Sequence, residues 1–132
     1  MEIQQTRIVL KARSFDRTSR FYEQVMGFPR LSSWEADDGR RALFEAGTAV
    51  IEVVGRPRGE ERSSRDEAFD YQGPEHKLRL DLVVPSAEAA YEELLFRDRN
   101  TVGGLRRESD GAPGLCTTDP AGVNTVLREP AY

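Results

Sequence analysis

The sequence contains few of the residues that build disulfides and metal sites. Among its 132 residues there is one cysteine, Cys116, and one histidine, His76. A single cysteine cannot form an internal disulfide, which is typical of proteins in a reducing compartment, so a cytoplasmic location is expected. The sequence also lacks an apolar run near the ~20 residues that cross a bilayer. Its first residues lack the basic and apolar regions of a signal peptide, and no membrane partner is expected.

Basic charge is not in excess either. The chain has 19 lysine and arginine residues against 23 aspartate and glutamate residues, and its net charge at pH 7 is -4. Proteins that bind nucleic acid usually have a net basic face, so no nucleic-acid partner is expected. Apolar residues make up 38% of the chain, and a chain of this length is expected to form one domain with a modest core.

One pattern of predicted elements occurs twice along the chain. A strand, an amphipathic helix and three further strands are predicted in residues 4–54, and again in residues 78–130. Such a repeat indicates a duplicated supersecondary unit whose two copies bury each other. The single domain 1–132 is therefore expected to consist of two modules. A charged linker over residues 55–77 joins them, and His76 is expected to be exposed within it.

Local signals place the elements of the first module. Alternating apolar and polar residues predict a strand over residues 7–12. Ser14 or Asp16 is expected to cap a helix that runs to about Met26, before Gly27 ends it. An Asp-Asp-Gly turn then predicts a hairpin. The three remaining strands are expected at residues 30–36, 41–45 and 49–54.

The second module has weaker signals after its helix. A strand is expected over residues 79–84, and Pro85-Ser86 starts a helix with an apolar stripe. The last strand follows a tight turn at residues 119–122. The three strands after the helix are expected at residues 105–109, 115–118 and 123–128.

Two segments carry a resemblance to a known superfamily. Residues 19–28, SRFYEQVMGF, are similar to the first helix of vicinal oxygen chelate proteins, a group that includes glyoxalase I, extradiol dioxygenases and bleomycin-resistance proteins. Residues 119–124, DPAGVN, are similar to the Asp-Pro-x-Gly-Asn turn before the last strand, with the asparagine displaced by one position. The resemblance implies an α+β fold of two βαβββ modules that form a curved mixed sheet around a cleft, and a homodimer. Neither segment is catalytic, so the resemblance predicts the fold better than the activity.

The resemblance also implies where a metal would bind. In metal-dependent members the ligands come from the first and last strands of each module, and are typically His, Glu or Gln. The matching positions here are Arg7, Glu52, Arg79 and Val126. Arginine only donates hydrogen bonds, and valine has no donor atom. Because a catalytic metal normally has about three protein ligands, this metal site is expected to be missing, and no cofactor is expected.

Strand alternation predicts which other side chains face the cleft. If the modules pair as in the superfamily, Glu52 lies near Arg7 and Arg79. Three interpretations stay open: a structural Arg–Glu–Arg network, guanidinium groups that bind an anionic ligand, and Glu52 as a general base, a role that flanking arginines oppose. Trp34 and Phe44 are candidates for a pocket wall, with core or dimer contact as the alternative. The candidate ligand-binding residues are Arg7, Lys11, Trp34, Phe44, Glu52, Arg79, Asn124 and Arg128.

Three functions are compatible with this sequence. The first is a metal-independent glyoxalase/bleomycin-resistance-like protein that binds a small, partly anionic organic molecule. The second is a metal-dependent lyase, isomerase or dioxygenase with an atypical ligand set, and the third is an accessory or structural dimer without a ligand. The side chains at Arg7, Arg79 and Val126 favour the first function over the second. No residue is assigned a catalytic role.

Overall fold

The computed structural model describes residues 1–58, 78–98, 100 and 103–130. The chain divides into two units, Met1–Gln72 and Gly73–Tyr132. Most of the expected linker, including His76, lies outside the described residues. Within the described residues, no helix has the length and apolar character needed to cross a membrane.

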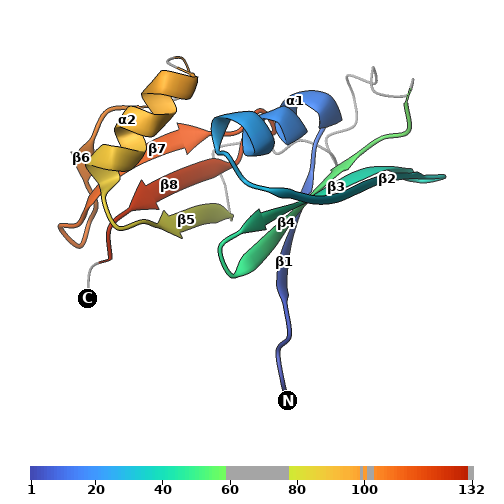
Figure 1. The fold of residues 1–132 in the computed structure, drawn as a ribbon, viewed down its shortest axis with the longest axis horizontal. Coiled ribbons are helices and arrows are strands. Elements are labelled where there is room, and N and C mark those ends of the chain that lie inside the picture. Colours follow the sequence, from blue (N-terminus) through green and yellow to red (C-terminus); the bar gives the residue numbers. More distant parts are fainter. Residues whose placement is uncertain (59–77, 99, 101–102, 131–132) are drawn as a thin grey trace. The chain divides into compact units, whose positions relative to one another are not determined.

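The first unit has a mixed four-stranded sheet with the order β1-β4-β3-β2 (Figure 1). β1 (Thr6–Lys11) is parallel to β4 (Ala49–Gly55), and β3 (Gly39–Ala46) is antiparallel to both β4 and β2 (Arg30–Ala36). The predicted hairpin joins β2 to β3 through Gly39, which has a φ of 148°. A Cβ at Gly39 would lie 2.2 Å from the carbonyl oxygen of Gly55, so the hairpin can approach β4 only with glycine at this position.

The helical segment of the first unit begins at the expected N-cap, but its last turn is π-helical instead of α-helical. Ser14 is the N-cap, because its hydroxyl accepts a hydrogen bond of 3.4 Å from the backbone N–H of Arg17. α1 (Phe15–Arg20) continues directly into a π-helical turn, η1 (Phe21–Val25). Gly27 follows with a φ of 75°, the left-handed conformation that commonly ends a helix.

The core of the first unit lies between this helical segment and the sheet. Tyr22 and Phe44 are fully buried, and their ring centroids are 6.3 Å apart. Phe21 meets Tyr22 edge-on at 5.1 Å, an arrangement that aromatic rings prefer. α1 approaches β4 at Gly55, where a Cβ would lie 2.4 Å from Cβ of Phe15. The close packing of Phe15 on the sheet therefore depends on this glycine.

The second unit has the same strand order, β5-β8-β7-β6 (Figure 1). β5 (Arg79–Val83) is parallel to β8 (Asn124–Arg128), and β7 (Pro113–Thr118) is antiparallel to both β8 and β6 (Arg106–Arg107). α2 (Ala87–Arg97) is capped by Ser86 and buries Ala87, Ala90 and Leu94. The repeat of strand order, with first and last strands parallel in each unit, confirms the predicted pair of βαβββ modules.

One predicted strand is shorter than expected. The sequence predicts a strand over residues 105–109, but β6 covers two residues. The chain turns after β6, where the N–H of Gly111 donates to the carbonyl oxygen of Glu108 at 2.8 Å. The N–H of Glu108 in turn donates to the carbonyl oxygen of Ala112. Gly111 has a φ of 90°, which favours glycine at this turn. The turn uses the backbone groups that a longer strand would have paired.

Candidate functional site

Strand register places four of the candidate residues on one face of the first sheet. Residues directly opposite one another on neighbouring strands point to the same side. Arg7 on β1 is opposite Val50 on β4. Glu52 lies two residues after Val50 on β4, so it points to the same side as Arg7. Lys11, Val54, Arg41 and Trp34 form one row across all four strands. Arg7, Lys11, Trp34 and Glu52 therefore share a face with Arg41, which we call the Arg7–Glu52 face.

Glu52 lies at the centre of an ion-paired cluster on this face. Its side chain is 11% exposed, and its Oε1 accepts a hydrogen bond of 3.1 Å from Nη1 of Arg7. Its Oε2 is 3.6 Å from Nη1 of Arg41. Arg41 also donates to Asp38 at 2.9 Å, and Arg7 donates to Gln5. A buried carboxylate must be compensated, and two guanidinium groups compensate this one.

Arg41 was not among the residues predicted from the sequence. Its role depends on the hairpin register, which sets Arg41 opposite both Trp34 and Val54. The Asp-Asp-Gly turn and the alternation along residues 41–45 contain this signal. Extending the alternation from Leu43, which is opposite Glu52, places Arg41 on the same face.

The two aromatic candidates lie on opposite faces of the sheet. Trp34 is 40% exposed and lies beside Arg41 on the Arg7–Glu52 face. Phe44 is opposite Ile51 and is fully buried against Tyr22 in the core. This placement favours core contact for Phe44 over a role in a pocket wall. It leaves Trp34 as the accessible aromatic surface of the pair.

The candidate residues of the second unit also share a face of their own sheet. Arg79 is opposite Asn124, and Arg128 is opposite Val83 on the same strand pair. Asn124 accepts a hydrogen bond of 3.1 Å from the hydroxyl of Thr118. Arg128 pairs with Asp110 and donates to the backbone oxygen of Glu129. The predicted alternation of β5 and β8, which sets these residues on one face, therefore agrees with the observed register.

Arg79 has carboxylate partners within its own unit. Its Nε and Nη2 donate to the two oxygens of Asp81 at 2.6 and 2.9 Å. This bidentate hydrogen bond raises the pKa of Arg79 and lowers the pKa of Asp81. Nη2 of Arg79 is also 3.8 Å from Glu108. The expected approach of Arg79 to Glu52 involves both units and stays a prediction.

Two acidic residues near β6 were missed at the sequence level. Glu108 is buried and accepts a hydrogen bond of 2.9 Å from Nε of Arg106. Asp110 accepts from the backbone N–H of Ala112, which lowers its pKa, and Arg128 lowers it further. Both residues occupy the turn that replaces the end of the predicted strand. Strand alternation therefore could not predict that Glu108 lies near Arg79, or that Asp110 lies near Arg128.

The donor set does not fit the divalent metal that the superfamily resemblance implies. Of the four matching positions, Glu52 is engaged by Arg7 and Arg41, and Arg79 by Asp81. The fourth position, Val126, is an apolar side chain on β8. In the part of the chain that the structure describes, no group of three or more His, Cys, Asp and Glu residues is placed to hold a metal ion. Guanidinium groups only donate hydrogen bonds, so they cannot replace the missing ligands.

Comparison with protein families agrees with the fold and with the two signature segments. Residues 4–127 match the model of the Glyoxalase/Bleomycin resistance protein/Dioxygenase superfamily. This chain belongs to that superfamily, as the sequence resemblance implied. No protein in a search of curated sequences matches it.

Solved structures share this fold over nearly the whole chain. A glyoxalase family protein from Enterococcus faecalis is similar with a TM-score of 0.68 and 20% identity, over 97% of each chain. TnmS3, an antibiotic binding protein from Streptomyces sp. CB03234, has a TM-score of 0.67 and 20% identity over 98% of each chain. The trypanothione-dependent glyoxalase I of Leishmania major has a TM-score of 0.66 and 16% identity, over 98% of this chain and 86% of that one. At these identities the comparison shows a common fold.

Proposed function

We propose that this protein binds a small, partly anionic organic molecule on its Arg7–Glu52 face, and does so without a metal ion. One observation carries the proposal: the carboxylate at a metal-ligand position of the superfamily, Glu52, is buried between Arg7 and Arg41. A carboxylate in this position orients guanidinium groups. The chemistry that such a site offers is hydrogen-bond donation to an oxyanion rather than coordination of a cation.

The side chains around Glu52 suit a ligand with a charged group and an apolar part. Arg7 has five N–H donors in a planar fork, and its contacts with Gln5 and Glu52 use one hydrogen on each nitrogen. Lys11 is exposed at the end of β1 and adds a second positive charge. Trp34 adds an exposed aromatic surface on the same face. The face thus offers positive charge and an aromatic surface to such a ligand.

The fold comparisons are consistent with a binding function. TnmS3 is described as an antibiotic binding protein, so the superfamily fold can serve binding. The glyoxalase I structures are those of enzymes. The residues at the metal positions of this chain support binding over metal-dependent catalysis, because three of the four, Arg7, Arg79 and Val126, have no metal-ligating atom.

A homodimer in the cytoplasm completes the proposal. β2 is an edge strand of the first sheet, and every one of its residues is exposed, including Leu31. An exposed edge strand with apolar side chains is a natural contact for a second chain. Light scattering after size-exclusion chromatography tests the dimer: a mass near twice 14.9 kDa is expected, and a monomer would contradict it.

Ligand binding is tested with matched acidic and neutral aromatic compounds. Acidic compounds are expected to bind more tightly, and Arg7→Gln is expected to weaken them by roughly ten- to a hundredfold, the equivalent of one charged hydrogen bond. Arg17→Gln is the control, because Arg17 is exposed on α1 and away from this face. Equal binding of neutral compounds on this face, or an unchanged acid preference of this face in Arg7→Gln, would show that its arginines are structural.

A further inference from the structure

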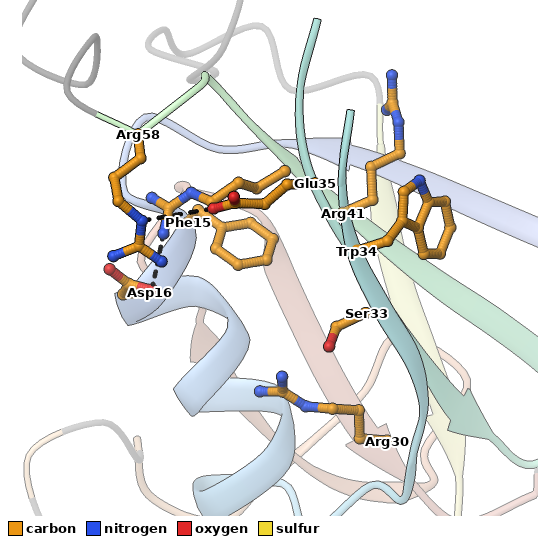
Figure 2. A pocket seen from close by; sticks show the side chains of 9 residues that line it. Phe15, Asp16, Arg30, Ser33, Trp34, Glu35, Arg41 and Arg58 are labelled. Carbon is orange, nitrogen blue, oxygen red and sulfur yellow. Dashed lines mark hydrogen bonds and ion pairs between the residues drawn. The ribbon is translucent and has the colours of Figure 1, made fainter. Parts of the chain in front are cut away.

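A pocket of about 390 Å³ lies within the first unit, between α1 and strands β2 and β3 (Figure 2). Its volume is in the range of small-molecule sites. Neighbouring residues of a strand point to opposite faces, so Arg40 faces away from Arg41 and from the Arg7–Glu52 face. Figure 2 shows Trp34 and Arg41 on the far side of β2 from the other side chains. Trp34 and Arg41 also border the pocket, and its lining on the α1 side includes Phe15, Asp16, Ser33, Glu35, Arg40 and Arg58.

Arg40 is the fixed cation of this pocket. Its side chain is 3% exposed, and its guanidinium carbon lies 4.7 Å from the centroid of the Phe15 ring. Its Nη1 donates to Asp16 at 3.3 Å, although Asp16 is 62% exposed. Packing on the ring and the sheet therefore holds the guanidinium, while the carboxylate that faces it extends into solvent.

A second ion pair closes the pocket on its outer side. Nε of Arg58 donates to Oε1 of Glu35 at 3.4 Å, and the two side chains are 74% and 59% exposed. Exposed pairs of this kind contribute little to stability. Arg30 lines the pocket further along β2, and the hydroxyl-bearing Ser33 lies between the two ends. The carboxylate of Glu35 can therefore exchange for another at small cost.

We propose that this pocket is a second ligand site, whose anchor Arg40 lies on the opposite side of the sheet from Arg7 and Glu52, and that it takes a small molecule with a carboxylate group. Arg40 is its anchor and Arg58 its outer donor. The groups that these arginines already hold are the carboxylates of Asp16 and Glu35, so a ligand carboxylate fits the same donors. The ligand replaces these side chains, which swing into solvent, and its apolar part lies against the Phe15 edge of the pocket.

Benzoate and its neutral analogue benzamide test the proposal in the full-length protein. Binding is followed by NMR through the side-chain Nε–H signals of Arg40 and Arg58, with the signal of Arg7 reporting on the other face. Benzoate is expected to shift the signals of Arg40 and Arg58 with a Kd of about 1–10 mM, as suits a fragment of this size. Benzamide is expected to leave them unchanged. Shifts confined to Arg7, or equal shifts with benzamide, would overturn this site and leave the proposed function untouched.

Two exposed substitutions separate a ligand site from a structural ion pair. Glu35→Gln removes the competing carboxylate and is expected to tighten benzoate binding by about two- to fivefold. Arg58→Gln removes the outer donor and is expected to weaken it by about three- to tenfold. Arg17→Gln, on α1 but not among the lining residues, is the matched control. Weaker binding in Glu35→Gln, or unchanged binding in Arg58→Gln, would contradict the proposal.

Discussion

Arg7 donates a hydrogen bond of 3.1 Å to Glu52 across the parallel strands β1 and β4. The two residues are 45 positions apart in sequence, and Arg41 approaches the same carboxylate from β3. The first unit thus neutralises its buried carboxylate with its own arginines. In the second unit Arg79 pairs with Asp81. Each unit therefore contains a guanidinium group that a neighbouring carboxylate orients.

Removal of the buried carboxylate tests the cluster directly. Glu52→Ala is expected to lower the free energy of unfolding by about 1–3 kcal/mol, because two charged contacts are lost and a gap remains. Glu45→Ala is the control, since Glu45 is exposed on the neighbouring strand β3 and is expected to change stability by less than about 0.5 kcal/mol. Urea unfolding measures both. Equal effects of the two substitutions would show that the cluster contributes nothing.

Purified protein is expected to contain no stoichiometric transition metal. The expectation follows from the side chains Arg7, Arg79 and Val126, which have no metal-ligating atom at three of the four superfamily positions. Elemental analysis after extensive dialysis is the measurement. A metal near one per chain that disappears in Glu52→Ala would restore the metal-dependent enzyme as the better interpretation.

The single tryptophan provides a direct signal for binding on the Arg7–Glu52 face. Trp34 is half-exposed and lies beside Arg41, so an aromatic acid bound there is expected to change its fluorescence. The change should saturate with ligand concentration and be reduced in Arg7→Gln. A titration in Arg58→Gln is the control for the second pocket, because Trp34 also borders that pocket. Fluorescence that responds in Arg7→Gln as it does in wild type would place the ligand elsewhere.

The Arg79–Asp81 pair predicts a pH dependence of stability. Hydrogen bonding to Arg79 lowers the pKa of Asp81 below its ordinary value of 3.8. A lowered pKa in the folded state means that the stabilisation is present above about pH 3.8 and is lost as the pH falls from there through the folded pKa. The pair is exposed, so its contribution is about 1 kcal/mol or less.

Asp81→Asn is therefore expected to be less stable than wild type at pH 7 and equally stable at strongly acidic pH. Urea unfolding at a series of pH values measures the difference between the two proteins. Asp37→Asn, at an exposed position of the β2–β3 hairpin, is the matched control. A difference that stays constant below pH 3.8 would contradict the assignment to this ion pair.

Local sequence signals were sufficient for most of the elements. The predicted strand at residues 30–36 has the same bounds as β2, and the series of a strand, a helix and three strands, repeated along the chain, was predicted from the sequence alone. These features are local, because alternation within a strand and a turn signal between strands specify them. β6 is shorter than predicted for a reason that is also local, the turn that begins at Glu108.

The parts of the site that were missed depend on contacts between distant segments. Arg41 reaches Glu52 only because of the hairpin register. Arg40 and Asp16 are 24 residues apart, and their pairing depends on how Phe15 packs on β4 at Gly55. Residue type and alternation do not specify such packing, so the second pocket could not be predicted from the sequence.

The turn that resembles a superfamily signature is expected to be structural. The carboxylate of Asp119 is buried, and its Oδ1 accepts hydrogen bonds from the backbone N–H groups of Ala121 and Val123 at 2.9 and 2.8 Å. Asp119→Ala leaves these donors unpaired and is expected to cost about 1–3 kcal/mol of stability. Asp119→Asn keeps one acceptor oxygen and should recover part of the loss. Thermal unfolding measures this order, and ligand binding on the Arg7–Glu52 face should be unchanged in both variants below their melting temperatures. A stable Asp119→Ala protein that has lost ligand binding would instead make this turn part of the site.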